Sequence, residues 1–133
     1  VTTNNITSAI DQLTDQDWAE LGYVVSGEAA RGTDDEFGVA ANVLTRLLSG
    51  NYGETIADVI RQPDQYEAVT IGTARYEPKL SARLKANKEK IIEFYKRLDG
   101  RTEFKGQSML KNRVAAEDPM FDPKGNFYHY AGQ

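Results

Sequence analysis

The stretch Thr14–Ala30, TDQDWAELGYVVSGEAA, has the apolar spacing of an amphipathic helix and fixes the start of the fold. Thr14 is a suitable N-cap, and two aspartates follow in the first turn, where the helix dipole favours negative charge. With about 100° per residue, one face of the helix carries the large apolar side chains Trp18, Leu21, Val24 and Val25. Glu28 falls inside this apolar arc. A carboxylate in such surroundings is costly, so the position of Glu28 needs an explanation.

Partial burial offers a chemical explanation for Glu28. Desolvation raises the pKa of a carboxyl group, and a carboxylic acid that is protonated near neutral pH can act as a general acid. The alternative is structural: Glu28 reaches water at a frayed helix end or pairs with Arg31. The residues on both sides are small, Ser26-Gly27 before the acid and Ala29-Ala30 after it. They either leave room for a ligand or allow two helices to pack closely.

Composition excludes several classes of function. The chain has 133 residues, which suits one domain with a real core, and its net charge is -4. This charge argues against an electrostatic grip on nucleic acid. The absence of cysteine excludes a disulfide framework, and no spacing of side chains suggests a metal site or a nucleotide-binding loop. We therefore expect no cofactor and no metal, and the lack of a long apolar run predicts no membrane insertion.

The pattern along the rest of the chain predicts a mostly helical α+β domain with a small irregular or β portion. Residues 1–13 are polar and rich in Thr and Asn, and we expect them to be a loose lead-in to one domain over 14–133. Further helices are expected over 35–50, over 53–63 with Thr55 as N-cap, and over 78–100. The tail at 118–132 is rich in turn residues and then aromatic, which favours an extended conformation.

Four blocks of the sequence, taken in order, resemble one family. They are VVSGEAARG (24–32), FGVAANVLTRLLSG (37–50), VIRQPDQYEAV (59–69) and DPKGNFYHY (122–130). Together they look like the cell-wall hydrolase family that includes the spore cortex-lytic enzymes, and its Gln-Pro-x-Gln-aromatic run is intact. The resemblance implies a lysozyme-like domain that cleaves peptidoglycan glycan strands between N-acetylmuramic acid and N-acetylglucosamine.

The resemblance also implies a mechanism. The family's acid maps onto Glu28, and the family resembles lytic transglycosylases, in which one Glu acts first as acid and then as base. The 6-hydroxyl of the sugar attacks C1 and leaves a 1,6-anhydro end, which differs from the usual pair of carboxylates. The helical wheel places no second acid beside Glu28. The acids Asp34, Asp35 and Glu36 are interpreted as a cap and dipole partners at the start of the next helix, and the alternative is that one of them is a second catalytic carboxylate.

Two alternatives remain open for the function. One is a hydrolytic muramidase that uses water. The other is a non-catalytic peptidoglycan-binding or structural module of a virion or wall protein. The resemblance implies an extracytoplasmic setting, in the cell wall or periplasm, or association with a phage virion. A start at Val1 fits a domain excised from a larger chain or processed, and a virion assembly is one expected setting.

Substrate contacts are expected in two further places. In the turn at 62–66, the amides of Gln62 and Gln65 and the ring of Tyr66 can bind a sugar; the alternative is a connector with exposed polar groups. In the strand-like tail, side chains alternate, so Phe127 and His129 share one face and Tyr128 and Tyr130 the other. The full set of expected binding residues is Ser26, Gln62, Gln65, Tyr66, Tyr128, His129 and Tyr130.

Three departures from the family pattern bear on these sugar contacts. Ser26 stands where the family has Tyr, Ala30 is an extra residue, and Ala131 replaces the family's Asn. They leave the acid at Glu28 in place. The resemblance favours Tyr128 and Tyr130 as the pair that faces the cleft.

Overall fold

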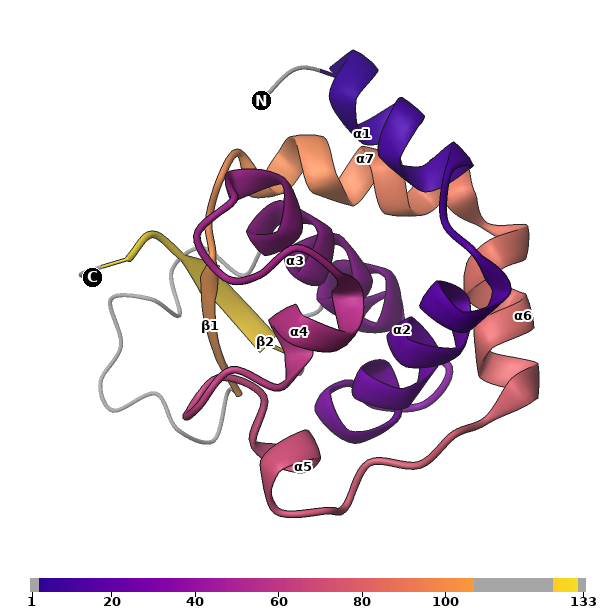
Figure 1. Cartoon of the computed structure of the whole chain (residues 1–133), viewed down its shortest axis with the longest axis vertical. Helices are drawn as coiled ribbons and strands as arrows, with labels where there is room; N and C mark the ends of the chain where they lie inside the picture. Colours follow the sequence, from indigo (N-terminus) through magenta and orange to yellow (C-terminus); the bar gives the residue numbers. More distant parts are fainter. Residues whose placement is uncertain (1–2, 107–125, 132–133) are drawn as a thin grey trace.

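The prediction of a mostly helical α+β domain is confirmed. The computed structural model describes residues 3–106 and 126–131 (Figure 1). The elements, in chain order, are α1 (Thr3–Asp11), α2 (Asp15–Glu28), α3 (Asp35–Ser49), α4 (Ile56–Ile60), α5 (Glu67–Thr70), α6 (Pro78–Ala86), α7 (Lys88–Leu98), β1 (Glu103–Gly106) and β2 (Asn126–His129).

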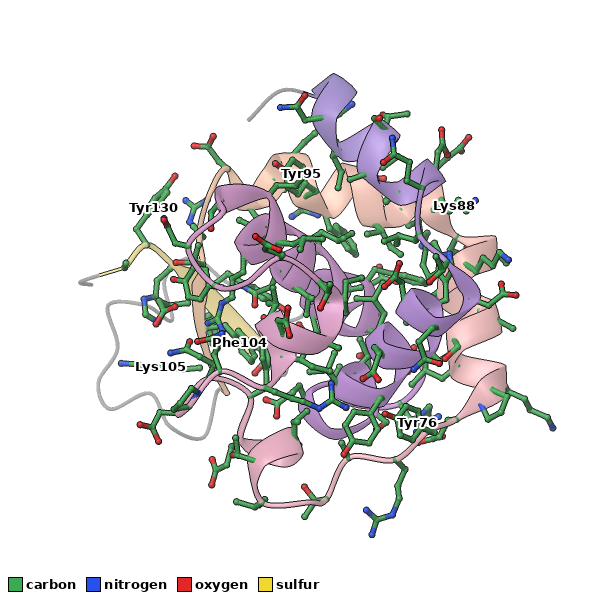
Figure 2. The ribbon with its side chains drawn as sticks, in the orientation of Figure 1. Tyr76, Lys88, Tyr95, Phe104, Lys105 and Tyr130 are labelled. Atoms are coloured by element: carbon green, nitrogen blue, oxygen red, sulfur yellow. The ribbon has the colours of Figure 1, made fainter. Side chains whose placement is uncertain are left out.

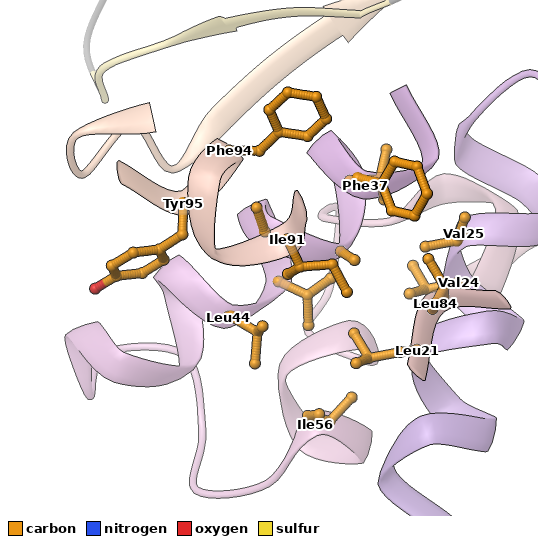
Figure 3. Close-up of a cluster of buried hydrophobic side chains, with 14 of the residues drawn as sticks. Leu21, Val24, Val25, Phe37, Leu44, Ile56, Leu84, Ile91, Phe94 and Tyr95 are labelled. Carbon is orange, nitrogen blue, oxygen red and sulfur yellow. The ribbon is translucent and has the colours of Figure 1, made fainter. Parts of the chain in front are cut away.

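Helix α3 runs through the middle of the molecule and the other elements pack around it (Figure 1). It is buried from Asp35 to Arg46, and its most extensive contacts are with α7 and α2. Figure 3 shows apolar side chains of α2, α3, α4, α6 and α7 that meet in one cluster. The labelled members are Leu21, Val24, Val25, Phe37, Leu44, Ile56, Leu84, Ile91, Phe94 and Tyr95. Their burial supplies the main driving force for folding.

The predicted helix ends are confirmed where a cap defines them. Thr14 and Asp17 form a reciprocal capping box: the Thr14 hydroxyl accepts from the Asp17 N–H at 3.1 Å, and the Thr14 N–H donates to the Asp17 carboxylate at 2.9 Å. Thr55 caps α4 by accepting from the Asp58 N–H at 3.1 Å. Gly50 ends α3 with a φ of 78°, a left-handed conformation that glycine adopts without steric cost.

The helix expected over 78–100 is two helices. The chain bends at Asn87, whose φ of -121° and ψ of 40° are not helical, and this separates α6 from α7. The Asn87 amide donates to the Arg83 carbonyl at 2.7 Å. Asparagine side chains compete with the helical backbone for such hydrogen bonds, which explains the break. The apolar periodicity alone did not reveal it, because Leu84 and Ile91 are buried on both sides of the bend.

The expectation of a loose lead-in over 1–13 is wrong, because this segment contains helix α1. Ile6 and Ile10 are four residues apart, so they lie on one face of the helix, and both are fully buried. Helix α1 packs on α7 and on α3 (Figure 1). Two apolar residues in a polar stretch are enough to anchor a helix when a neighbouring helix offers an apolar surface.

The strands β1 and β2 form an antiparallel pair in which Phe104 is opposite Tyr128. The rings of these two residues lie 5.5 Å apart, and Phe104 is also 6.0 Å from the ring of Tyr66. Arg46 of α3 anchors the start of β1 by donating to the Thr102 carbonyl at 2.8 Å. The pair of strands therefore rests on the middle of the helical core. Within the described residues, no helix has the length and apolar character needed to cross a membrane.

The buried stripe of α1 leads to a stability prediction. We expect Ile10→Ala to lower the free energy of unfolding by about 2–5 kcal/mol, because it leaves a cavity between α1 and α7. Urea unfolding followed by circular dichroism measures this. The control is Thr7→Ala on the exposed face of the same helix, which should change stability by no more than about 0.5 kcal/mol. Equal, small effects of both substitutions would show that α1 is not part of the core.

Candidate active site

Glu28 is the last residue of α2, and its side chain is half-buried. Its carboxylate oxygen Oε2 accepts a hydrogen bond from the Ala68 N–H at 2.9 Å. Ala68 belongs to the first turn of α5, where backbone N–H groups have no partner within the helix. The short helix α5 therefore holds the side chain of Glu28 through a backbone N–H group.

Burial raises the pKa of the Glu28 carboxyl above its usual range. The hydrogen bond from Ala68 opposes this effect and lowers the pKa, the negative charge of Glu67 raises it, and the positive charge of Arg46 lowers it. One form of the structural alternative, an ion pair between Glu28 and Arg31, is not found among the described contacts. Arg31 pairs instead with Glu77 at 2.5 Å.

The small residues before Glu28 serve close packing. A Cβ atom on Gly27 would lie 2.3 Å from the Cβ of Ala68, so glycine is needed for α5 to approach this end of α2. The Ser26 hydroxyl donates to the Tyr23 carbonyl at 2.6 Å and accepts from the Arg75 N–H at 2.9 Å. Ser26 thus ties the segment after α5 to α2, and its hydroxyl, expected to bind substrate, is engaged by the backbone.

The interpretation of the three acids at 34–36 as a cap and dipole partners is incomplete. Asp34 occupies the N-cap position of α3 without a side-chain cap hydrogen bond, and it lies 3.5 Å from Lys90. Asp35 is only 1% exposed, and Glu36 is equally buried beside the guanidinium of Arg83. Buried carboxylates require partners, and those partners come from distant segments that local sequence does not reveal.

Asp35 connects helix α3 with strand β2. Its Oδ1 accepts from the Tyr128 hydroxyl at 2.8 Å, and its Oδ2 accepts from the Asn126 amide at 2.5 Å. The same Asn126 nitrogen donates to the backbone carbonyl of Glu28 at 2.8 Å. Asp35 and Glu28 therefore share one amide group between them, although they belong to different helices.

Two of the aromatic residues expected to bind sugar are buried. Tyr66 is fully buried, its hydroxyl donates to Asn42 at 2.7 Å, and Arg46 stacks on its ring at 4.7 Å. Tyr128 is 5% exposed. Stacking on a pyranose ring needs an exposed ring face, so the expectation for Tyr66 and Tyr128 is corrected. Phe127 is buried as well, since β2 is covered on both faces, and simple alternation assumed one solvent-facing side.

Three other expected binding residues are half-buried, and the described contacts do not bring them together with Glu28. Gln62 lines an open groove with Glu20 and Arg61 at the end of α4, and Gln65 is half-buried. His129 is half-buried, with its Nδ1 3.1 Å from the Tyr130 carbonyl. These three residues, with Tyr130, remain predictions as sugar contacts.

Tyr130 is 37% exposed, and its hydroxyl donates to Asp99 at 2.9 Å. The guanidinium of Arg101 lies 4.6 Å from the centre of its ring. Figure 2 shows Tyr130 on the opposite side of the molecule from Tyr76. Its place is therefore fixed by the turn after α7, between the end of that helix and β1.

Sequence reasoning missed four residues around Glu28: Asp35, Glu67, Ala68 and Asn126. Glu67 is exposed and close enough to Glu28 to raise the pKa of that carboxyl. A helical wheel treats one helix at a time, so it cannot reveal an acid that another element brings near. In the described part of the chain, no group of three or more His, Cys, Asp or Glu side chains could hold a metal ion.

Comparison with known proteins defines the family. The family model of the cell wall hydrolases matches residues 30–130, which is most of the chain. No curated protein and no solved structure matches the chain. The chain belongs to the cell wall hydrolase family, and peptidoglycan is the substrate that this membership implies. The matched range contains Asp35, Glu67, Ala68 and Asn126 and begins two residues after Glu28.

The contact of Gly27 with Ala68 leads to a prediction about the site. We expect Gly27→Ala to lower the free energy of unfolding by about 1–3 kcal/mol, because the added methyl group forces α5 away from α2. The amide resonance of Ala68 should move as its hydrogen bond to Glu28 lengthens. The double variant Gly27→Ala/Ala68→Gly removes the opposing methyl group and should recover most of the stability. Failure of this rescue would mean that the close approach of the two helices is not the cause.

Proposed function

We propose that this protein cleaves peptidoglycan glycan strands between N-acetylmuramic acid and N-acetylglucosamine as a lytic transglycosylase. Glu28 is the proposed acid and base. The observation that carries the proposal is the setting of this one carboxyl: it is half-buried, its pKa is raised, and the Ala68 N–H holds one of its oxygens at 2.9 Å. A raised pKa makes the protonated form of a carboxyl more accessible, and a residue that acts first as acid and then as base needs both of its forms.

The proposed reaction has two proton transfers through Glu28. Protonated Glu28 donates its proton to the glycosidic oxygen as the bond from that oxygen to C1 breaks. The resulting carboxylate then accepts the proton of the sugar's 6-hydroxyl as O6 forms a new bond to C1. The bond from the Ala68 N–H to Oε2 favours Oε1 as the oxygen that carries the proton. No water is consumed, and the carboxyl ends the cycle protonated.

The setting of Asp35 argues against this residue as a second catalytic acid. The Asn126 amide links Asp35 to the backbone of Glu28. However, Asp35 is 1% exposed and each of its oxygens already accepts a hydrogen bond. It is therefore poorly placed to activate a water molecule. A reaction that uses Glu28 alone needs an intramolecular nucleophile, and the 6-hydroxyl of the sugar provides one.

Hydrolysis is the second candidate, and the position of Glu67 favours it. This acid is exposed, lies next to Ala68 and interacts electrostatically with Glu28. A muramidase would use Glu67 as the base that activates water while Glu28 protonates the leaving oxygen. The non-catalytic alternative, a module that only binds the wall, makes no use of either acid. For each of these functions we propose an extracytoplasmic or virion-associated setting, because that is where peptidoglycan is reached.

The central test uses purified peptidoglycan and mass spectrometry. We expect the wild-type protein to release muropeptides with 1,6-anhydro ends, which are one water lighter than hydrolysed products. We expect Glu28→Gln to lower the rate by at least about a hundredfold, the scale of general acid catalysis. The amide keeps an oxygen for the Ala68 N–H but cannot donate a proton.

The matched control is Asp34→Asn, which removes an exposed charge and should keep most of the activity.

Urea unfolding checks that Glu28→Gln is folded. The raised pKa means that wild-type stability falls as the pH rises through the pKa of Glu28, so the variant should gain relative stability above that pH. Near-normal lysis by Glu28→Gln would refute Glu28 as the acid. Unchanged wall binding by Glu28→Gln, together with no glycan product from the wild type, would favour the non-catalytic module.

The role of Glu67 leads to a pH prediction. Activity requires protonated Glu28, so it falls as the pH rises through the pKa of that carboxyl. Glu67→Gln removes a neighbouring negative charge, which lowers the pKa of Glu28 and moves this loss of activity to lower pH. Initial rates over a pH series, with the products analysed by mass, measure the shift. Collapse of turnover at every pH, together with only reducing-end products from the wild type, would assign the reaction to hydrolysis.

A further inference from the structure

We infer that Asn126 and Asp35 are positioning residues that fix the backbone of Glu28 at the end of α2. The inference rests on the proposed role of Glu28. It concerns two residues that do not touch the site of bond cleavage and that act through hydrogen bonds to Glu28 or to each other.

The Asn126 amide forms a bridge between two helices. Its Nδ2 atom donates to the Glu28 carbonyl at 2.8 Å and to Asp35 Oδ2 at 2.5 Å. A side-chain amide nitrogen has two hydrogens, so both of its donor positions are used. The geometry of one planar group thereby sets the distance between the end of α2 and the start of α3.

The end of α2 needs such a contact. The last four carbonyl groups of a helix have no hydrogen-bond donor within that helix. The terminal turn frays unless other groups bind these carbonyls. Immediately after Glu28, Ala29 is extended, with a φ of -128° and a ψ of 147°. A residue at this boundary has few restraints of its own. The hydrogen bond from Asn126 restrains the peptide group between Glu28 and Ala29.

Asp35 in turn holds Asn126. It is the first residue of α3, where the helix dipole stabilises its negative charge, and charged acceptors form stronger hydrogen bonds than neutral ones. Asn126 and Tyr128 are two apart in β2, so their side chains lie on the same face and reach the two oxygens of this carboxylate. All three residues are buried, which shields the hydrogen bonds from competing water.

Glu28 is consequently held at two points. The bridge from Asn126 holds its main chain, and the Ala68 N–H holds its carboxylate. The two restraints come from different segments, β2 and α5. Catalytic rates are sensitive to displacements of about 1 Å. Loss of either restraint should therefore lower turnover more than it weakens substrate binding.

The test measures kcat and KM for Asn126→Ala on purified peptidoglycan, well below the melting temperature of the variant. We expect kcat to fall roughly tenfold or more, with KM within about twofold of the wild type, as for a misplaced acid. Asp35→Asn should show the same direction, because an amide at position 35 presents one oxygen acceptor in place of two. The stability-matched control is Ile10→Ala, which destabilises the core from α1 and should leave kcat unchanged.

A readout that does not use activity accompanies the kinetics. In Asn126→Ala, hydrogen exchange of the amides in the last turn of α2 should be faster than in Ile10→Ala. Each variant is measured at the same interval below its own melting temperature. If Asn126→Ala does not fold, Asn126→Ser replaces it, because a serine hydroxyl has one donor and a shorter reach. Wild-type kcat together with unchanged exchange in the folded variant would overturn the inference alone. Full activity in Glu28→Gln, measured in parallel, would overturn the proposed function and this inference together.

Discussion

The structure depends on one constraint: helix α3 is buried along most of its length although it carries five buried polar side chains. They are Asp35, Glu36, Asn42, Thr45 and Arg46. A buried polar group without a partner costs more free energy than its hydrogen bond contributes, so the neighbours of α3 must supply partners. Only Thr45 is satisfied within the helix, by donating to the Ala41 carbonyl at 2.8 Å.

The partners of the other four come from segments that are far away in the sequence. Strand β2 serves Asp35, α6 serves Glu36 through Arg83, and Tyr66 donates to Asn42. Arg46 binds the Thr102 carbonyl and the Glu103 carboxylate, and thereby fixes the start of β1. The polar residues of α3 therefore determine where the two strands and the turn at 62–66 are placed, while the apolar residues supply the driving force. Tyr66 is buried for this reason, and it acts as a hydrogen-bond donor instead of a sugar platform.

The limits of sequence reasoning follow from the same constraint. Periodicity and caps predicted α2, α3 and α4 well, because their determinants, such as Thr14 and Gly50, are local. Asp35 looked like a cap because the sequence around it is that of a helix start, whereas its partners lie 91 and 93 positions away. Glu67 could not be assigned to the site, because only the close approach of α5 to α2 brings it near Glu28. The four family blocks did contain these partners, but a resemblance gives order along the chain and not contacts.

The acidity of Glu28 shows how a chemical property can belong to the whole fold. Burial and Glu67 favour the protonated form, and the Ala68 N–H and Arg46 favour the anion. Three of these influences require α5 and α3 to be in place, and α5 reaches Glu28 only because Gly27 has no side chain. A proposed acid that must later act as a base needs both forms to be accessible. Opposing influences of this kind keep the cost of each form moderate, whereas burial alone would stabilise the protonated form and slow the second proton transfer.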